Sequence, residues 1–169
     1  MREQIKLLLT YNQNENKEVI RILEGLSEDE RLLDRKSYYK SLHGIADHIA
    51  LVEVFYEKAI VDGITKLSNI KPTELSEIID FNAISFQNFT ILKTVLEKAD
   101  DEYMELFNNL TEEDLNTMIT RNSPRGVVTS PAWVIILQQI NHGIHHRGQI
   151  MQMLEEMDID ANFGMLKYQ

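Results

Sequence analysis

The sequence predicts an all-α protein, an antiparallel four-helix bundle with a short hairpin or loop before the last helix. Apolar residues recur at helical spacing through most of the 169 residues. Glycines and capping residues delimit four long segments. No internal repeat or linker divides the chain. With 43% hydrophobic and 26% charged residues, the composition fits one globular domain over residues 1–169.

The elements follow from these patterns in order. Four long helices are expected, covering about residues 2–25, 39–61, 83–110 and 131–157. Ser27–Glu30 has the form of a capping box, and Thr111–Asp114 resembles a second capped turn. A surface connection is expected over residues 62–80, around Pro72.

A hairpin is expected before the last helix. Residues 117–120 and 127–129 are rich in β-branched side chains, and the five residues between Arg121 and Val127 are turn formers. Ser130 is then expected to cap the last helix, with Pro131 at its first position.

Charge and composition exclude several classes of partner. The chain has 17 Lys and Arg against 27 Asp and Glu, a net charge of −10, which disfavours binding to nucleic acid. No run approaches the roughly 18 apolar residues of a membrane span, and no signal peptide is visible, so we expect a cytoplasmic protein. There is no cysteine, so disulfides and zinc-thiolate sites are excluded.

Three of the five histidines lie in the last expected helix. Because a helix advances 100° per residue, His142 and His146 lie about 40° apart on one face, where two imidazoles can bind one cation. His145 lies about 60° from His142 and is the weaker candidate. The polar stripe on this face is either a hydrogen-bond network or the wall of a site, and it comprises Gln138, His142, His146 and Gln149.

A third ligand has to come from another helix, and the remaining histidines are His43 and His48. Val52, Phe55 and Ala59 lie within about 40° of His48, so His48 is predicted to face inward as the third ligand. His43 lies about 140° away and is predicted to sit near a helix end, hydrogen-bonded or exposed.

Two further residues of the last helix have structural interpretations. Arg147 is expected to pair with a carboxylate such as Glu53, which faces away from His48. Gly148 is expected to permit close helix contact. No acid joins the polar stripe, so the sequence shows no general base.

Two segments resemble the signatures of a known family, the DinB-like (YfiT-like) metalloenzymes. Ser37–Ile49 looks like the family's second-helix signature and Asn141–Gln149 like its last-helix signature, in the same order. The helix layout is similar across nearly the whole chain. The resemblance implies a four-helix bundle of DinB type, often a homodimer. It also implies that His48, His142 and His146 bind a divalent cation such as zinc, nickel, iron or manganese.

The resemblance implies function classes as well. Some members are thiol S-transferases that use a low-molecular-weight thiol such as bacillithiol or mycothiol, or glutathione-like isomerases. Three imidazoles leave coordination positions open, which serves either thiol transfer or hydrolysis of a small molecule. Two alternatives stay open: a non-catalytic metal- or small-ligand-binding bundle, and a helical interaction protein whose histidines are hydrogen-bonded core residues.

Overall fold

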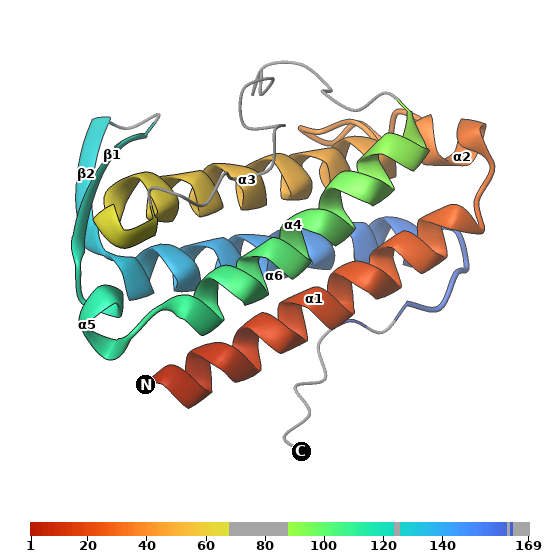
Figure 1. Cartoon of the computed structure of the whole chain (residues 1–169). Helices are drawn as coiled ribbons and strands as arrows, with labels where there is room; N and C mark the ends of the chain where they lie inside the picture. The colour runs from red at the N-terminus through yellow and green to blue at the C-terminus, as the bar shows by residue number, and fades with distance from the viewer. Residues whose placement is uncertain (68–87, 124–125, 162, 164–169) are drawn as a thin grey trace.

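The protein is mostly helical, with one small sheet (Figure 1). The computed structural model describes residues 1–67, 88–123, 126–161 and 163. The long helices are α1 (Arg2–Glu24), α3 (Leu42–Gly63), α4 (Phe89–Asn109) and α6 (Ala132–Glu155). The short elements are α2 (Glu28–Leu32), the 3₁₀ helix η1 (Thr65–Leu67), α5 (Glu112–Leu115), β1 (Met118–Ser123) and β2 (Gly126–Pro131).

Side-chain caps explain most helix starts. The predicted capping box at Ser27 and the predicted capped turn at Thr111 are confirmed, because each side chain accepts from the backbone N–H three residues on. The start of α3 was predicted three residues early, because the Ser41 side chain accepts from the Gly44 N–H and begins the helix at Leu42. In α4 the side chain of Asn88 caps the first turn.

Two predicted boundaries have different outcomes. The predicted start of the third long helix and most of the connection over residues 62–80 lie outside the described residues. The predicted cap of the last helix was wrong. Ser130 pairs with Ile119 in the sheet and Pro131 with Met118, so the strand continues to Pro131 and α6 begins at Ala132.

Each long helix packs against two others: α3 against α4 and α6, and α1 against α4 and α6. Not every neighbouring pair is antiparallel, since α3 and α4 both run from right to left in Figure 1. Residues 64–88 connect them.

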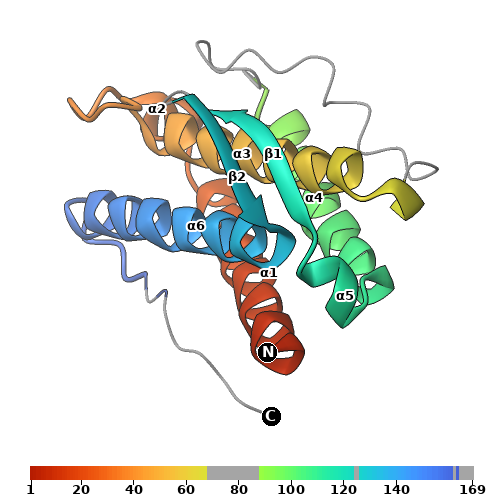
Figure 2. The same cartoon turned by 90° about the vertical axis from the view of Figure 1, so that its left-hand side faces the viewer.

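The antiparallel hairpin of β1 and β2 lies beside one end of α3 and α6 (Figure 2). It confirms the predicted hairpin and extends it to six residues in each strand. Ile119 is its buried anchor, at 3% exposure. A Cβ on Gly63 would come within 2.7 Å of the Ile119 side chain, so the glycine at the end of α3 permits the strand to approach.

A buried polar layer divides the hydrophobic core. One apolar cluster fills the end of the protein near α2 and a second fills the end near the hairpin. Between them lie buried polar and charged side chains from all four long helices: Asn12, Asn16, Glu53, Glu57, Asp100, Gln139 and Arg147. No helix among the described residues is long and apolar enough to cross a membrane.

Candidate metal centre

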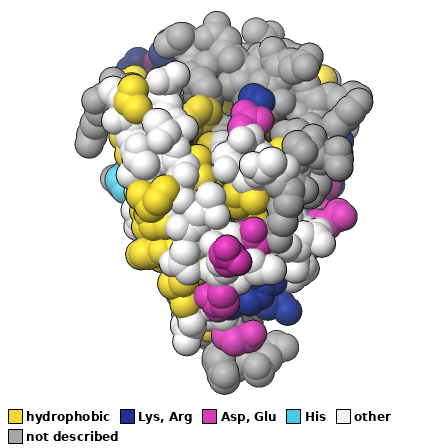
Figure 3. Space-filling view, turned by 60° about the vertical axis from the view of Figure 1, so that its left-hand side comes forward, with side chains coloured by type: hydrophobic (Ala, Val, Ile, Leu, Met, Phe, Trp, Pro, Cys, Tyr) yellow, Lys and Arg dark blue, Asp and Glu magenta, His cyan; other side chains and the backbone are white. Residues whose placement is uncertain are grey.

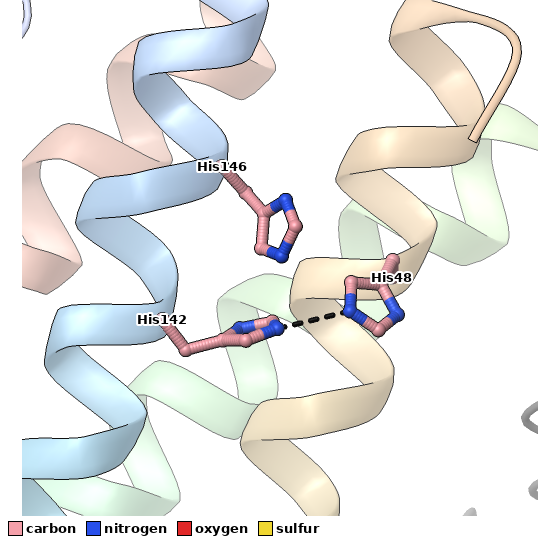
Figure 4. A group of neighbouring side chains, drawn as sticks. All are labelled: His48, His142 and His146. Atoms are coloured by element: carbon pink, nitrogen blue, oxygen red, sulfur yellow. Dashed lines mark hydrogen bonds between the residues drawn. The ribbon is translucent and has the colours of Figure 1, made fainter. Parts of the chain in front are cut away.

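The three histidines predicted as ligands lie together between α3 and α6 (Figure 4). Their ligating nitrogens lie within 4.8 Å of one another. The Nε2 atoms of His48 and His142 are 2.9 Å apart. The His146 ring centroid is 4.8 Å from that of His48 and 4.3 Å from that of His142. Residues distant in sequence therefore form one cluster of imidazoles.

The donor set fits a divalent cation. Nitrogens bound at 2.0–2.1 Å in a tetrahedral site lie roughly 3.3 Å from one another, and the separations found here bracket that value. Gln149 accepts from His146 Nδ1 at 2.7 Å. Because the amide oxygen accepts, the proton of His146 stays on Nδ1 and Nε2 keeps its lone pair for a metal.

Burial keeps the imidazoles neutral. Desolvation, followed by the charge of His146, lowers the pKa of His48 to about 4. Desolvation and the neighbouring histidines lower the pKa of His142 to about 3. The pKa of His146 is also lowered, chiefly by desolvation. Metal ligation needs the neutral imidazole, which is therefore the dominant form at neutral pH.

The cluster lies on the solvent side of the α3–α6 interface, which corrects the prediction that His48 faces inward. His48 and His142 are half-buried, and His146 is 6% exposed. On α3, Glu53 and Glu57 point about 140–180° away from His48, and they are the buried residues. The apolar face at His48 misled the prediction because Phe55 and Ala59 line a surface groove instead of the core.

Tyr39 is a site residue that sequence reasoning missed. Its hydroxyl lies 2.8 Å from His48 Nε2, its ring stacks on that imidazole, and its edge contacts His146. Desolvation raises the pKa of the Tyr39 phenol, which therefore stays protonated and can donate a hydrogen bond. Tyr39 precedes α3, so a helical wheel cannot place it. The signal was its position in the segment Ser37–Ile49.

The other residues of the predicted stripe separate into site and non-site positions. Gln149 belongs to the cluster through His146, whereas Gln138 is exposed. His145 is also exposed and lies outside the ligand group, although its ring contacts His146. His43 is buried at the start of α3 beside Phe89, so the prediction of a position near a helix end is confirmed.

Arg147 points into the buried polar layer. Its Nη1 donates to the amide oxygens of Asn12 and Asn16, at 2.9 and 2.7 Å. The same two side chains donate from Nδ2 to Glu53, at 2.6 and 3.0 Å. The expected pairing of Arg147 with Glu53 therefore runs through two amides. Asp100 also accepts from Asn16.

The close helix contact occurs at Gly143, and the expectation for Gly148 was wrong. A Cβ on Gly143 would lie 2.7 Å from Asn12 Oδ1 and 2.8 Å from Arg147 Nη1. Gly148 is exposed and has open space around a Cβ. The missing side chain of Gly143 therefore leaves room for the hydrogen bonds from Arg147 to Asn12 and Asn16.

A mostly helical fold that carries a half-buried cluster of three histidines defines a class of candidate metal-binding proteins. The chain belongs to the DinB family, whose model matches residues 1–158. It is similar to a DinB-like protein from Bacillus subtilis, with a TM-score of 0.65, 16% identity and coverage of 98% of this chain and 99% of the other. It is also similar to one from Bacillus cereus ATCC 10987, with a TM-score of 0.57, 18% identity and coverage of 89% and 90%. Among curated proteins, none matches the chain.

Proposed function

We propose that this protein binds one divalent cation through His48, His142 and His146, and uses it in a transferase reaction of the thiol S-transferase type or in hydrolysis of a small molecule. The convergence of three neutral imidazoles carries the proposal. Zinc, nickel, iron and manganese all accept such ligands. Family membership and the packing of the long helices further support a four-helix bundle of DinB type.

A cation held by three imidazoles supplies a Lewis acid with open coordination positions. The protein's own residues prepare that site. Burial keeps the imidazoles neutral, Gln149 orients His146, and the Tyr39 hydroxyl is a donor for a substrate atom beside His48. The chain has no cysteine, so a nucleophilic sulfur has to come from a low-molecular-weight thiol.

The metal site is tested by single substitutions. We expect His48→Ala, His142→Ala and His146→Ala each to lower affinity for zinc or nickel by about tenfold or more, measured by calorimetry and elemental analysis. His145→Ala is the matched control, because it removes an exposed imidazole from the same helix. Purified wild-type protein without stoichiometric metal, together with unchanged affinity in His48→Ala, contradicts the proposal.

Catalysis is tested separately from metal binding. Wild-type protein and His48→Ala are assayed with small thiols and a chlorinated fluorogenic electrophile, and with ester substrates. Turnover that requires metal and is lost in His48→Ala supports the enzyme. Metal binding without turnover supports a non-catalytic metal- or small-ligand-binding bundle. That alternative is favoured by one observation: among the residues that the structure describes, no carboxylate joins the histidine cluster.

We also propose that the protein forms a homodimer, which the resemblance of its two histidine-containing segments to the DinB-like family implies. Light scattering on the purified full chain is the test. A mass twice that of one chain supports the proposal, and a mass equal to one chain contradicts it.

A further inference from the structure

A groove lies between α3 and the hairpin, on the same side of α3 as His48. Its volume is about 670 Å³, which is within the range of small-molecule sites. Phe55 and Ala59 of α3 and Ile119 and Val127 of the hairpin form its apolar walls. Figure 3 shows hydrophobic side chains gathered along the side of the protein that carries the hairpin.

Among the described residues that line this groove, Arg121 of β1 is the charged side chain without an ion-pair partner. Lys58 also lines the groove, but it pairs with Asp62 at 2.9 Å. The Arg121 guanidinium carbon lies 5.3 Å from the Tyr56 ring centroid. Its Nε is buried and has no hydrogen-bond partner in the described part of the chain. No ion pair joins Arg121 to a carboxylate among the described residues. A cation held against an aromatic ring on a chain of net charge −10 is a local site for an anion.

The groove and the histidine cluster share one face of one helix. Phe55 and Ala59 lie within about 20° of His48 around α3. Tyr56, the residue under Arg121, follows His48 by eight residues, which is about 12 Å along the helix. A molecule with an anionic end at Arg121 and an apolar stem along Phe55 and Ala59 therefore lies on the same face of α3 as His48. Ala59 follows His48 by eleven residues, so the stem passes the level of Tyr56 on the side away from the histidines.

We propose that this groove binds the carboxylate end and apolar stem of an amphipathic carboxylic acid, with Arg121 as the carboxylate partner. This inference rests on the proposed function only for the identity of the bound molecule as a substrate, because the groove lies on the same face of α3 as His48. Carboxylate is favoured because the planar guanidinium can donate two parallel hydrogen bonds to it. The apolar walls select a hydrocarbon stem over a sugar or polyphosphate.

The experiment compares two probes of equal length, octanoate and octan-1-ol, by calorimetry and by amide chemical shifts of the labelled full chain. We expect octanoate to bind at millimolar concentration or below, with shifts in residues 55–63 and 119–122. Octan-1-ol should bind about tenfold more weakly, because it lacks the charge-assisted hydrogen bonds. Equal binding of the two probes, no octanoate binding, or shifts confined to other regions overturns the inference.

Matched variants identify the partner residue. Arg121→Met should raise the dissociation constant of octanoate by about tenfold and leave that of octan-1-ol unchanged. Arg21→Met removes an arginine from the surface of α1 and should change neither value. Ala59→Trp should block both probes by filling the groove, and circular dichroism checks that each variant is folded. An unchanged octanoate constant in Arg121→Met overturns the inference even if Ala59→Trp does not fold.

His48→Ala separates this inference from the metal proposal. Octanoate binding within twofold of the wild type in this variant places the carboxylate at Arg121. Loss of octanoate binding places it at the histidines and overturns the inference. Conversely, a protein that binds octanoate but has no affinity for metal would support the inference about Arg121 and contradict only the metal proposal.

Discussion

At the residue scale, the neutral imidazole of His48 and the buried acids Glu53 and Glu57 lie on opposite sides of α3. His48 is on the solvent side, where its pKa is lowered to about 4. Glu53 and Glu57 are on the core side, where desolvation raises the pKa of Glu53 to about 7 and that of Glu57 to about 8. The amides of Asn12 and Asn16 donate to Glu53 Oε1 and accept from Arg147. Among the described residues, Oε2 of Glu53 and Oε2 of Glu57 are both buried without a hydrogen-bond partner.

Glu57 makes the stability of the fold depend on pH. Burial first, then the charges of Glu102 and Glu53, raise its folded-state pKa from 4.5 to about 8. A raised folded-state pKa gives stability that is fully present below about 4.5 and is lost as pH rises toward 8. We therefore expect Glu57→Gln to raise the free energy of unfolding at pH 8 by about 1–3 kcal/mol, and by less at pH 5.

Urea denaturation of both proteins at the two pH values measures this difference. Glu105→Gln, at an exposed position of α4, controls for the loss of one surface charge. A Glu57→Gln variant with the same pH dependence as the wild type would show that Glu57 is ionised in the folded protein.

At the element scale, two faces of α6 make different contacts. One edge carries His142 and His146, and the buried side carries Gln139, Gly143 and Arg147. Gln139 donates to Glu53 Oε1, so α6 is tied to α3 by polar contacts behind the histidines. The network restrains the relative position of the two helices that carry the three clustered histidines.

The two glycines of α6 offer a matched test of that arrangement. We expect Gly143→Ala to lower the free energy of unfolding by about 1–3 kcal/mol, because its methyl group displaces Asn12 and Arg147 from their hydrogen bonds. Gly148→Ala should raise it by about 0.5–1 kcal/mol, because alanine favours the helix and meets nothing there. Chemical denaturation measures both. Equal effects of the two substitutions would mean that α6 can shift away from α1 without cost.

Periodicity predicted the four long helices and the three histidines that lie together, but not the side of α3 on which they lie. The wheel that grouped His48 with Phe55 and Ala59 was correct, and the inference that an apolar face is a core face was not. Asn16 of α1 and Asp100 of α4 are buried polar residues that hydrogen-bond to each other. The sequence pattern of a single helix cannot predict such a pair, because each residue's partner lies on a different helix. Tyr39 likewise depends on the loop before α3.

At the scale of the whole molecule, the proposed metal site joins two helices whose ligands are 94 residues apart in sequence. An ion bound only in the folded state stabilises it by RT ln(1 + [L]/Kd), about 2.7 kcal/mol at a hundred times Kd. For a chain of this length that corresponds to a rise in Tm of about 5–10 °C. The helices α3 and α6 pack directly against each other, so the ion would reinforce an existing contact.

We therefore expect zinc or nickel to raise the Tm of the chelator-treated protein by this amount, and added chelator to reverse the rise. His48→Ala should show a smaller rise, because a tenfold weaker affinity leaves about 1.4 kcal/mol of stabilisation at the same metal concentration. His145→Ala should respond like the wild type. Differential scanning calorimetry over a series of metal concentrations gives the shift. An equal shift in His48→Ala would locate metal binding on the acidic surface, since only binding that uses both helices is sensitive to that substitution.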